Sequence, residues 1–230
     1  MVNSSLPGEE LLKKGFDIGK ICVVRNIVEK ADDDPDEKDV DIRRENRIPE
    51  NAILVTGIGR NAIEKDFNFF IDVFAKASAE NSRLHGLILG SGGPPMSGKI
   101  KNLGLEGKFT LPGEVKSVMP FLKASDIFFL SSKHEGMANA LLEALQAGCS
   151  ILTTNVGGCT DIFESCNKDV LEKILLDDRD PDKAAAKLLS LSQNNSIRDY
   201  LKTNSEAFIS KFSHERIMPE YYKALGLESL

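Results

Sequence analysis

Residues 127–158 read IFFLSSKHEGMANALLEALQAGCSILTTNVGG, and this stretch decides the expected fold. It opens with a continuous apolar run at 127–130 and ends just after a second run at 151–153, and the leucines between the runs fall at helical spacing. A continuous apolar run is typical of a strand that helices cover on both faces, because neither face of such a strand meets solvent. The stretch therefore predicts a strand, a loop, a helix and a second, parallel strand.

The same alternation of apolar runs and amphipathic stretches extends along most of the chain. Phe67, Phe70, Ile71 and Phe74 follow the i, i+3, i+4, i+7 spacing of one helix face. Further strands are predicted at 53–55, 87–89, 109–111 and 174–176, and C-terminal helices at 184–191, 197–212 and 217–225. The predicted fold class is α/β, a Rossmann-like doubly wound parallel sheet with C-terminal helices.

The first 50 residues differ from the rest. Residues 8–14 have the pattern of a short helix, and the apolar run 21–24 predicts a strand. Acidic and basic side chains crowd around Pro35 in residues 32–47, which predicts a solvated linker because the stretch has little apolar area to bury.

Acidic residues in the linker allow a calcium-loop hypothesis. Asp32, Asp34 and Asp36 match the first three ligand positions of an EF-hand loop. Glu37 stands where the loop needs glycine, and Arg43 stands where it needs a bidentate glutamate. The spacing therefore argues against a metal site.

Composition excludes several function classes. Against 35 acidic residues stand 29 Lys and Arg, which gives a net charge of −6 and no positive field for nucleic acid. No run approaches the roughly 20 apolar residues of a bilayer span, and the first residues lack the order of a secretory signal. Four cysteines without a CxxC pair indicate reduced thiols. We expect a cytoplasmic protein that binds neither nucleic acid nor a resident metal.

Glycine and charge gather where the predicted strands end. Such residues line the ligand crevice of an open parallel sheet, although each glycine turn alone is also typical of a tight connection. Gly57 and Gly59 lack the third glycine of a dinucleotide fingerprint, so an NAD site is not indicated. The stretches that follow the strands are 57–60 with Lys65, 90–93, 131–136 and 156–158.

The strongest local feature is Glu135 followed eight residues later by Glu143. Amides of residues 136–139 at a helix start would bind a phosphate, with Arg60 and Lys65 completing the clamp. On a continuous helix the two acids would be ~12 Å apart. Glycosidase carboxylates are roughly 5 to 9.5 Å apart, so this pair fits the two ends of an extended ligand better.

Simpler roles remain open for these residues. Glu135 is also typical of a helix-capping acid, and Glu143 of a surface helix residue. Only His134 of the three histidines falls in the predicted crevice. No nucleophile or ligand spacing accompanies it, so a hydrolase triad or zinc site is not indicated.

Taken together, residues 131–158 resemble the donor-binding signature of the retaining glycosyltransferases of family 4, which have the GT-B architecture. The resemblance covers nearly the whole chain, and Ser5, Gly15, Lys20, Ile21 and Asn26 fit the end of the first GT-B domain. Its elements are Gly59-Arg60 with Lys65, Gly90-Ser91-Gly92, the Gly113 loop, Ala124 to Ile127, Glu135 with Glu143-Ala144, Ala147-Gly148, and Gly157-Gly158 with Asp161.

The resemblance implies a domain organisation. Such enzymes have two Rossmann-like halves, and this chain is similar to the C-terminal half, which binds the nucleotide-sugar. Residues 1–50 would be the end of the N-terminal domain plus the charged linker. Residues 51–205 would be the nucleotide-sugar-binding domain, and residues 206–230 a helical segment.

The resemblance also implies site roles. Arg60 and Lys65 would bind the donor diphosphate, Glu143 the ribose, and Glu135 the transferred sugar, without metal or cofactor. Ala138 stands where many relatives have proline. The implied catalytic residues are Glu135, Arg60 and Lys65, and the implied donor-binding residues are Gly59, Arg60, Lys65, Gly92, Glu114, Val115, Glu135, Gly136, Met137, Ala138, Asn139 and Glu143.

The implied reaction is transfer of a sugar from a nucleotide diphosphate sugar, with UDP favoured, with retention of configuration. The implied acceptor is a glycan or lipid in polysaccharide or lipopolysaccharide synthesis, bound through a missing N-terminal half that would also allow peripheral membrane association. We expect these residues alone to bind donor weakly and to transfer sugar slowly or not at all. A non-catalytic nucleotide-sugar-binding or regulatory module and a UDP-sugar epimerase remain the alternatives.

Overall fold

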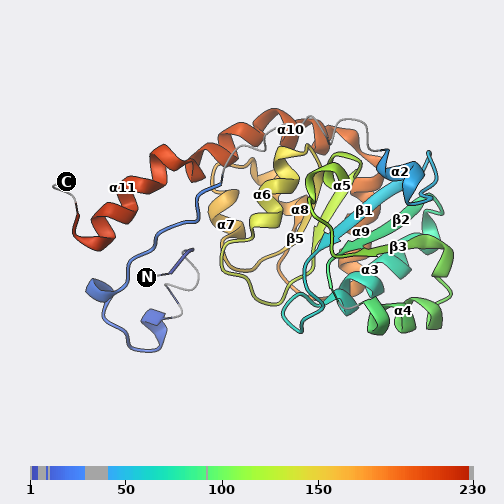
Figure 1. The fold of residues 1–230 in the computed structure, drawn as a ribbon, viewed down its shortest axis with the longest axis horizontal. Helices are drawn as coiled ribbons and strands as arrows, with labels where there is room; N and C mark the ends of the chain where they lie inside the picture. The colour runs from blue at the N-terminus through green and yellow to red at the C-terminus, as the bar shows by residue number, and fades with distance from the viewer. Residues whose placement is uncertain (1, 5–8, 10, 29–40, 92, 228–230) are drawn as a thin grey trace.

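The protein is described by a computed structural model that covers residues 2–4, 9, 11–28, 41–91 and 93–227. Six strands form one sheet in the order β3-β2-β1-β4-β5-β6, and each pair is parallel (Figure 1). The strands are β1 (Ile53–Ile58), β2 (Leu84–Leu89), β3 (Phe109–Gly113), β4 (Ile127–Leu130), β5 (Ser150–Thr154) and β6 (Leu175–Leu176). The predicted doubly wound parallel sheet is confirmed, and its strand order reverses between β1 and β4.

Strand β2 begins at Leu84, three residues before the predicted run. His85 and Gly86, which interrupt the apolar pattern, both contact residues of β3. His85 forms a hydrogen bond with Thr110, 2.9 Å between Nε2 and Oγ1, so its polar ring is tolerated in a buried strand. A Cβ at Gly86 would lie 2.3 Å from the ring of Phe109. The position therefore needs glycine, although glycine is a poor strand former.

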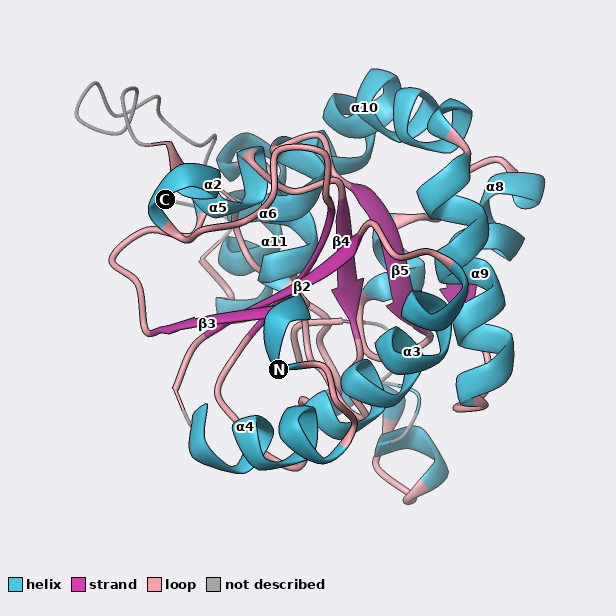
Figure 2. Cartoon of the chain, turned by 90° about the vertical axis from the view of Figure 1, so that its right-hand side faces the viewer, coloured by secondary structure: helices cyan, strands magenta, loops and turns pink. Residues whose placement is uncertain are grey.

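Helices cover both faces of the sheet. Helix α3 (Phe67–Glu80) packs against α4 (Gly93–Asn102) and α9 (Pro181–Gln193), and α6 (Asn139–Gln146) packs against α5 (Met119–Lys123) and α10 (Asn195–Ile209). Figure 2 shows the sheet between these two groups. The short elements are η1 (Ile18–Lys20), α2 (Ile42–Glu45), η3 (Glu106–Lys108), α7 (Cys159–Ile162), α8 (Lys168–Ile174) and η4 (Ser210–Phe212), and the chain continues into α11 (His214–Leu225).

The core follows from the apolar spacing of α3. Phe67, Phe70, Ile71 and Phe74 are all buried, as predicted. The ring of Phe70 stacks 5.1 Å from that of Phe129 on β4. These contacts fix the position of α3 on the sheet, and with it the loop that precedes α3.

The first 50 residues depart from prediction in the run 21–24 and at the end of the linker. The run 21–24 is not a strand in the structure. Among the described residues it forms one isolated bridge, between Val23 and Val2. Residues 11–13 are helical, within the short helix predicted at 8–14. The calcium-loop positions 32, 34, 36 and 37 lie outside the described residues.

The linker prediction for residues 32–47 is wrong at its C-terminal end. Helix α2 forms there, with Ile42 buried, because Arg43 is bound to the domain. Its guanidinium donates to the carbonyl of Ala124 and lies 2.9 Å from Oδ2 of Asp126. Asp126 also accepts a hydrogen bond from Arg198 on α10, so one carboxylate joins α2, the start of β4 and α10.

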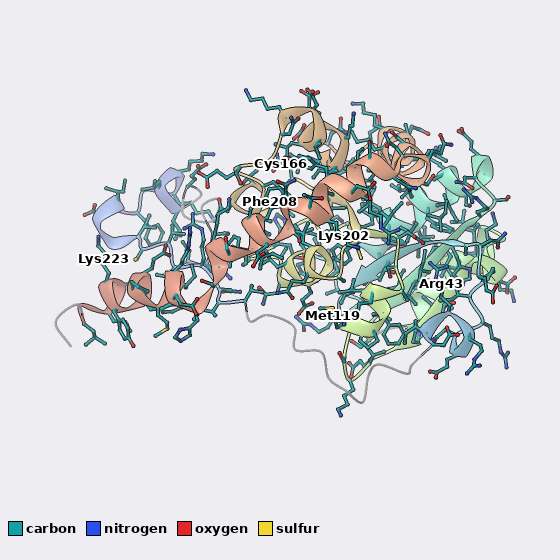
Figure 3. All side chains as sticks on the ribbon, turned by 90° about the horizontal axis from the view of Figure 1, so that it is seen from above. Arg43, Met119, Cys166, Lys202, Phe208 and Lys223 are labelled. Atoms are coloured by element: carbon teal, nitrogen blue, oxygen red, sulfur yellow. The ribbon has the colours of Figure 1, made fainter. Side chains whose placement is uncertain are left out.

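The C-terminal helices run along the domain and then beyond the sheet. The predicted helix 197–212 ends as an α-helix at Ile209 and continues as the η4 turn. Figure 3 labels Phe208 on α10 and Lys223 on α11, and Figure 1 shows α11 beside the N-terminal segment. The Nη1 atom of Arg25 lies 3.8 Å from Oε1 of Glu220 on α11. Among the described residues, no helix is both long enough and apolar enough to cross a bilayer.

Candidate functional site

The loops that follow β1 to β5 meet at the carboxyl edge of the sheet. Because the strand order reverses between β1 and β4, a ligand crevice is expected there. Backbone hydrogen bonds join the loops to each other. They run from Gly59 N to Leu89 O (2.9 Å), Gly90 N to Gly113 O (2.7 Å), Lys133 N to Glu64 O (2.7 Å) and Gly158 N to Gly136 O (2.7 Å).

Two glycines allow the loops to approach so closely. Gly90 has φ +125°, and a Cβ there would lie 2.0 Å from the carbonyl oxygen of Gly59. Gly157 has φ +55°, and a Cβ there would lie 2.3 Å from the oxygen of Gly136 and 2.4 Å from that of Glu135. Gly90 and Gly157 are therefore required by the packing of the loops themselves.

A pocket of about 350 Å³ opens between the loops after β1 and β4. The sequence predicted that Arg60, Lys65, Glu135 and Gly136 would meet, and the structure brings them together here. The lining residues are Arg60, Ala62, Glu64, Lys65, His134, Glu135 and Gly136.

The centre of the pocket is an ion pair between Lys65 and Glu135. The Lys65 Nζ lies 2.6 Å from Oε1 of Glu135, which also accepts a hydrogen bond of 2.6 Å from the buried hydroxyl of Ser132. The Glu135 side chain is only 11% exposed. A Cβ on Gly59 would lie 3.1 Å from three carbons of the Lys65 side chain. Glycine at position 59 therefore leaves room for Lys65 to extend toward Glu135. Both ions are held in one geometry.

The polar groups left over at this pair can bind a ligand. An ammonium carries three N–H donors, and Glu135 uses one of those on Lys65. Both hydrogen bonds to the Glu135 carboxylate from described residues go to Oε1, so its Oε2 is left without a partner among them. Arg60 is exposed at the pocket wall and forms no ion pair with any described side chain. Lys65 and Arg60 therefore offer donors to an anion, and Glu135 offers an acceptor to a hydroxyl.

The start of α6 contributes a third source of positive potential. Helix α6 begins at Asn139, three residues after Gly136, so Glu135 lies in the preceding loop, and the separation given for a continuous helix does not apply to the two acids. The N-cap is Ala138, which supplies no side-chain acceptor to the first amides. The partial positive charge of a helix start favours anions nearby.

The family of the chain is shown by comparison with known proteins. Residues 39–208 match the family model described as glycosyl transferases group 1. The chain belongs to this family.

Curated relatives of this group 1 chain are similar over about half of their length. A 2-deoxystreptamine N-acetyl-D-glucosaminyltransferase of Niallia circulans is 30% identical over 169 residues, which are 71% of this chain and 42% of that protein. A lipopolysaccharide core biosynthesis glycosyltransferase, LpsE, of Rhizobium meliloti is 27% identical over 189 residues, 77% of this chain and 51% of that protein. The chain spans about half the length of these relatives.

Solved structures share the fold. Anabaena HepE in complex with UDP-glucose superposes with a TM-score of 0.81 at 17% identity, covering 100% of this chain and 63% of that one. WaaG, a glycosyltransferase involved in lipopolysaccharide biosynthesis, has a TM-score of 0.77 at 15% identity, with 100% and 62% covered. The group 1 chain therefore has the fold of GT-B glycosyltransferases.

Several predicted donor-binding residues of the group 1 chain do not line the pocket. Met137 and Ala138 are buried, so their backbone is what they offer to a ligand. Glu114 is exposed in the loop after β3, and Val115 packs against the apolar cluster around Leu54. Asn139 accepts a hydrogen bond from Asn26, 3.1 Å from Nδ2 to Oδ1. Gly92 lies outside the described residues.

Glu143 lies on α6 and is half-buried, and burial raises the pKa of its carboxyl. The unfolded chain therefore loses this proton at a lower pH than the folded chain does. Ionisation then favours unfolding, so the stability of the folded state falls as pH rises through the two pKa values.

We predict that Glu143→Gln removes this pH-dependent loss. The free energy of unfolding of the wild type, relative to the variant, should fall as the pH rises from the ordinary glutamate pKa, about 4.3, through the raised pKa of Glu143, and stay level above it. Urea unfolding of both proteins at several pH values measures the difference. A wild type that gains stability relative to Glu143→Gln over this range contradicts the burial argument.

The structure adds residues that the sequence analysis missed. Asp66 and Arg179 form an ion pair behind Lys65, 2.7 Å between Oδ2 and Nη2. Arg179 follows β6, so an inspection of the residues after the sixth strand would have found it. Ser132 stood in the inspected stretch, but its bond to Glu135 depends on the turn that only the folded chain defines.

Proposed function

We propose that this group 1 chain binds a nucleotide diphosphate sugar, with UDP as the favoured nucleotide, at the carboxyl edge of the sheet. The observation that carries the proposal is the Lys65–Glu135 ion pair in a pocket that Arg60 also lines. Cations beside a carboxylate suit a ligand that joins a diphosphate to a hydroxyl-rich sugar. HepE, a protein with the same fold, is solved with UDP-glucose.

Arg60 and Lys65 are assigned to the diphosphate. As the bond between sugar and phosphate breaks, negative charge grows on the leaving diphosphate, and fixed cations stabilise it without rearrangement. The α6 start adds its partial positive charge. The proposal therefore assigns no resident metal or cofactor to the site.

Glu135 is assigned to the transferred sugar, where its Oε2 accepts a hydrogen bond from a sugar hydroxyl. Lys65 neutralises Glu135, which lowers the repulsion between that carboxylate and the bound diphosphate. Glu143 is assigned to the ribose hydroxyls, and its half-buried position favours strong hydrogen bonds there. Transfer is proposed to proceed with retention of configuration to a glycan or lipid-linked acceptor, held by a second, N-terminal half.

The proposal is tested by a transfer assay followed by NMR of the anomeric proton. The chain is incubated with UDP-sugars and simple acceptors, alone and with a separate protein that supplies an acceptor-binding half. Product with the donor's anomeric configuration, dependent on the added half, supports the proposal. Inverted product contradicts retention, and an epimerised UDP-sugar indicates an epimerase. UDP binding with no transfer under any of these conditions favours a non-catalytic binding module.

A further inference from the structure

Asp66 adopts the left-handed backbone conformation, which is uncommon for residues other than glycine. Among the described residues other than glycine, only Arg47 and Asp66 have positive φ, and Asp66 has φ 44° and ψ 55°. Strain of this kind persists where the surroundings hold it in place, and it is often found at functional sites. Asp66 directly follows Lys65 and caps α3, accepting from the amide of Phe69.

Arg179 holds the strained turn from the other side. Its Nη2 lies 2.7 Å from Oδ2 of Asp66 and 3.0 Å from the carbonyl oxygen of Ser131, and its Nη1 lies 3.0 Å from that of Ser132. The guanidinium also lies 4.3 Å from the centre of the Phe69 ring. Lys133 adds a second cation, 3.3 Å from the same Asp66 oxygen.

The segments that Arg179 joins are the ones that carry the ion pair of the pocket. On one side is the turn of Lys65 and Asp66. On the other are Ser131, whose hydroxyl donates to the carbonyl of Lys65, and Ser132, whose hydroxyl donates to Glu135. Every link is 3.0 Å or shorter, so a shift of the Arg179 guanidinium is transmitted to both partners of the ion pair.

We infer that Arg179 is a positioning residue that sets the geometry of Lys65 and Glu135 through Asp66 and the Ser131–Ser132 backbone. The inference rests on the proposed function, which assigns Lys65 to the donor diphosphate and Glu135 to the transferred sugar. Arg179 itself does not line the pocket. A fork of guanidinium donors is needed, because a single ammonium cannot reach Asp66 and both carbonyls in fixed directions.

The test compares Arg179→Met and Arg179→Lys with a matched control, Lys76→Met. Lys76 forms an ion pair with Asp182, which like Arg179–Asp66 joins α3 to the start of α9, but it contacts neither Lys65 nor the serines. Calorimetric titration of UDP should show about tenfold weaker binding for Arg179→Met. Arg179→Lys should recover part of the loss, and Lys76→Met should bind as the wild type does. Thermal unfolding confirms that each variant is folded.

A double-mutant comparison separates positioning from general destabilisation. In a Lys65→Ala background, Arg179→Met should change UDP affinity by less than about twofold, because its effect acts through Lys65. An equal loss in both backgrounds, or no loss in the wild-type background, overturns the inference while leaving the donor site standing.

A second cycle does not depend on nucleotide. Urea unfolding of Arg179→Met, Glu135→Gln and the double variant should give effects that do not add, because the two side chains share the Ser132 link. Additive effects overturn the inference. A wild type that binds no UDP refutes the donor-site proposal, and this cycle then decides the positioning role by itself.

Discussion

Replacing Lys65 by methionine is expected to weaken UDP binding by about 100-fold. The variant keeps the length of the side chain but removes its charge-assisted hydrogen bonds to the diphosphate. It also leaves Glu135, which is 11% exposed, as an unpaired carboxylate beside the bound anion. Both effects act in the same direction. Calorimetric titration of UDP into wild type and Lys65→Met measures the change.

Lys76→Met is the control for this experiment. Lys76 is also a lysine in an ion pair, 2.7 Å from Asp182, but it lies on the surface outside the pocket. Its loss should leave UDP affinity within twofold of wild type, because Lys76 does not line the pocket, and should change stability little, because exposed ion pairs contribute little to folding. Equal affinities for Lys65→Met and Lys76→Met would contradict the assignment of Lys65 to the diphosphate.

Replacing Gly157 by alanine is expected to destabilise the chain by about 3 kcal/mol. The new Cβ would lie 2.3 Å from the backbone oxygen of Gly136 and 2.4 Å from that of Glu135. Backbone atoms cannot rotate away as a flexible side chain can, so the whole Glu135 loop must move. The positive φ of +55° adds a cost for any residue with a Cβ. Urea unfolding measures the loss, and UDP titration should show weakened binding.

Gly148→Ala separates the cost of the positive φ from the cost of the backbone contact. Gly148 has φ +80°, but the nearest atom to a new Cβ is a side-chain carbon of Lys202 at 3.5 Å (Lys202 is labelled in Figure 3). This variant should lose only about 1 kcal/mol, the conformational cost alone. If Gly148→Ala and Gly157→Ala lose the same stability, the contact with the Glu135 loop is not what requires glycine at 157.

The central architecture could be predicted because each element carried its own signal. Continuous apolar runs gave all six strands, and the phenylalanine spacing gave the buried face of α3. Parallel pairing then places the ends of β1 and β4 at the same edge. This is why Arg60 and Lys65 could be expected beside Glu135 although about 70 residues separate them in sequence.

The remainder depended on contacts that sequence spacing does not encode. The β2 start was missed because His85 and Gly86 interrupt the apolar run, and only the β3 residues Thr110 and Phe109 explain them. Helix α2 was missed because the partner of Arg43, Asp126, is 83 residues away. Asp66 and Arg179 are 113 residues apart, and neither belongs to a recognisable motif.

The most direct test of the account is calorimetric titration of UDP into the wild type and Glu143→Gln, at low salt and without divalent metal. The account predicts that the wild type binds UDP and that Glu143→Gln binds it about tenfold more weakly, because a neutral amide forms weaker hydrogen bonds to the ribose hydroxyls than a carboxylate does. Absence of UDP binding by the wild type, or equal affinities for both proteins, would contradict it.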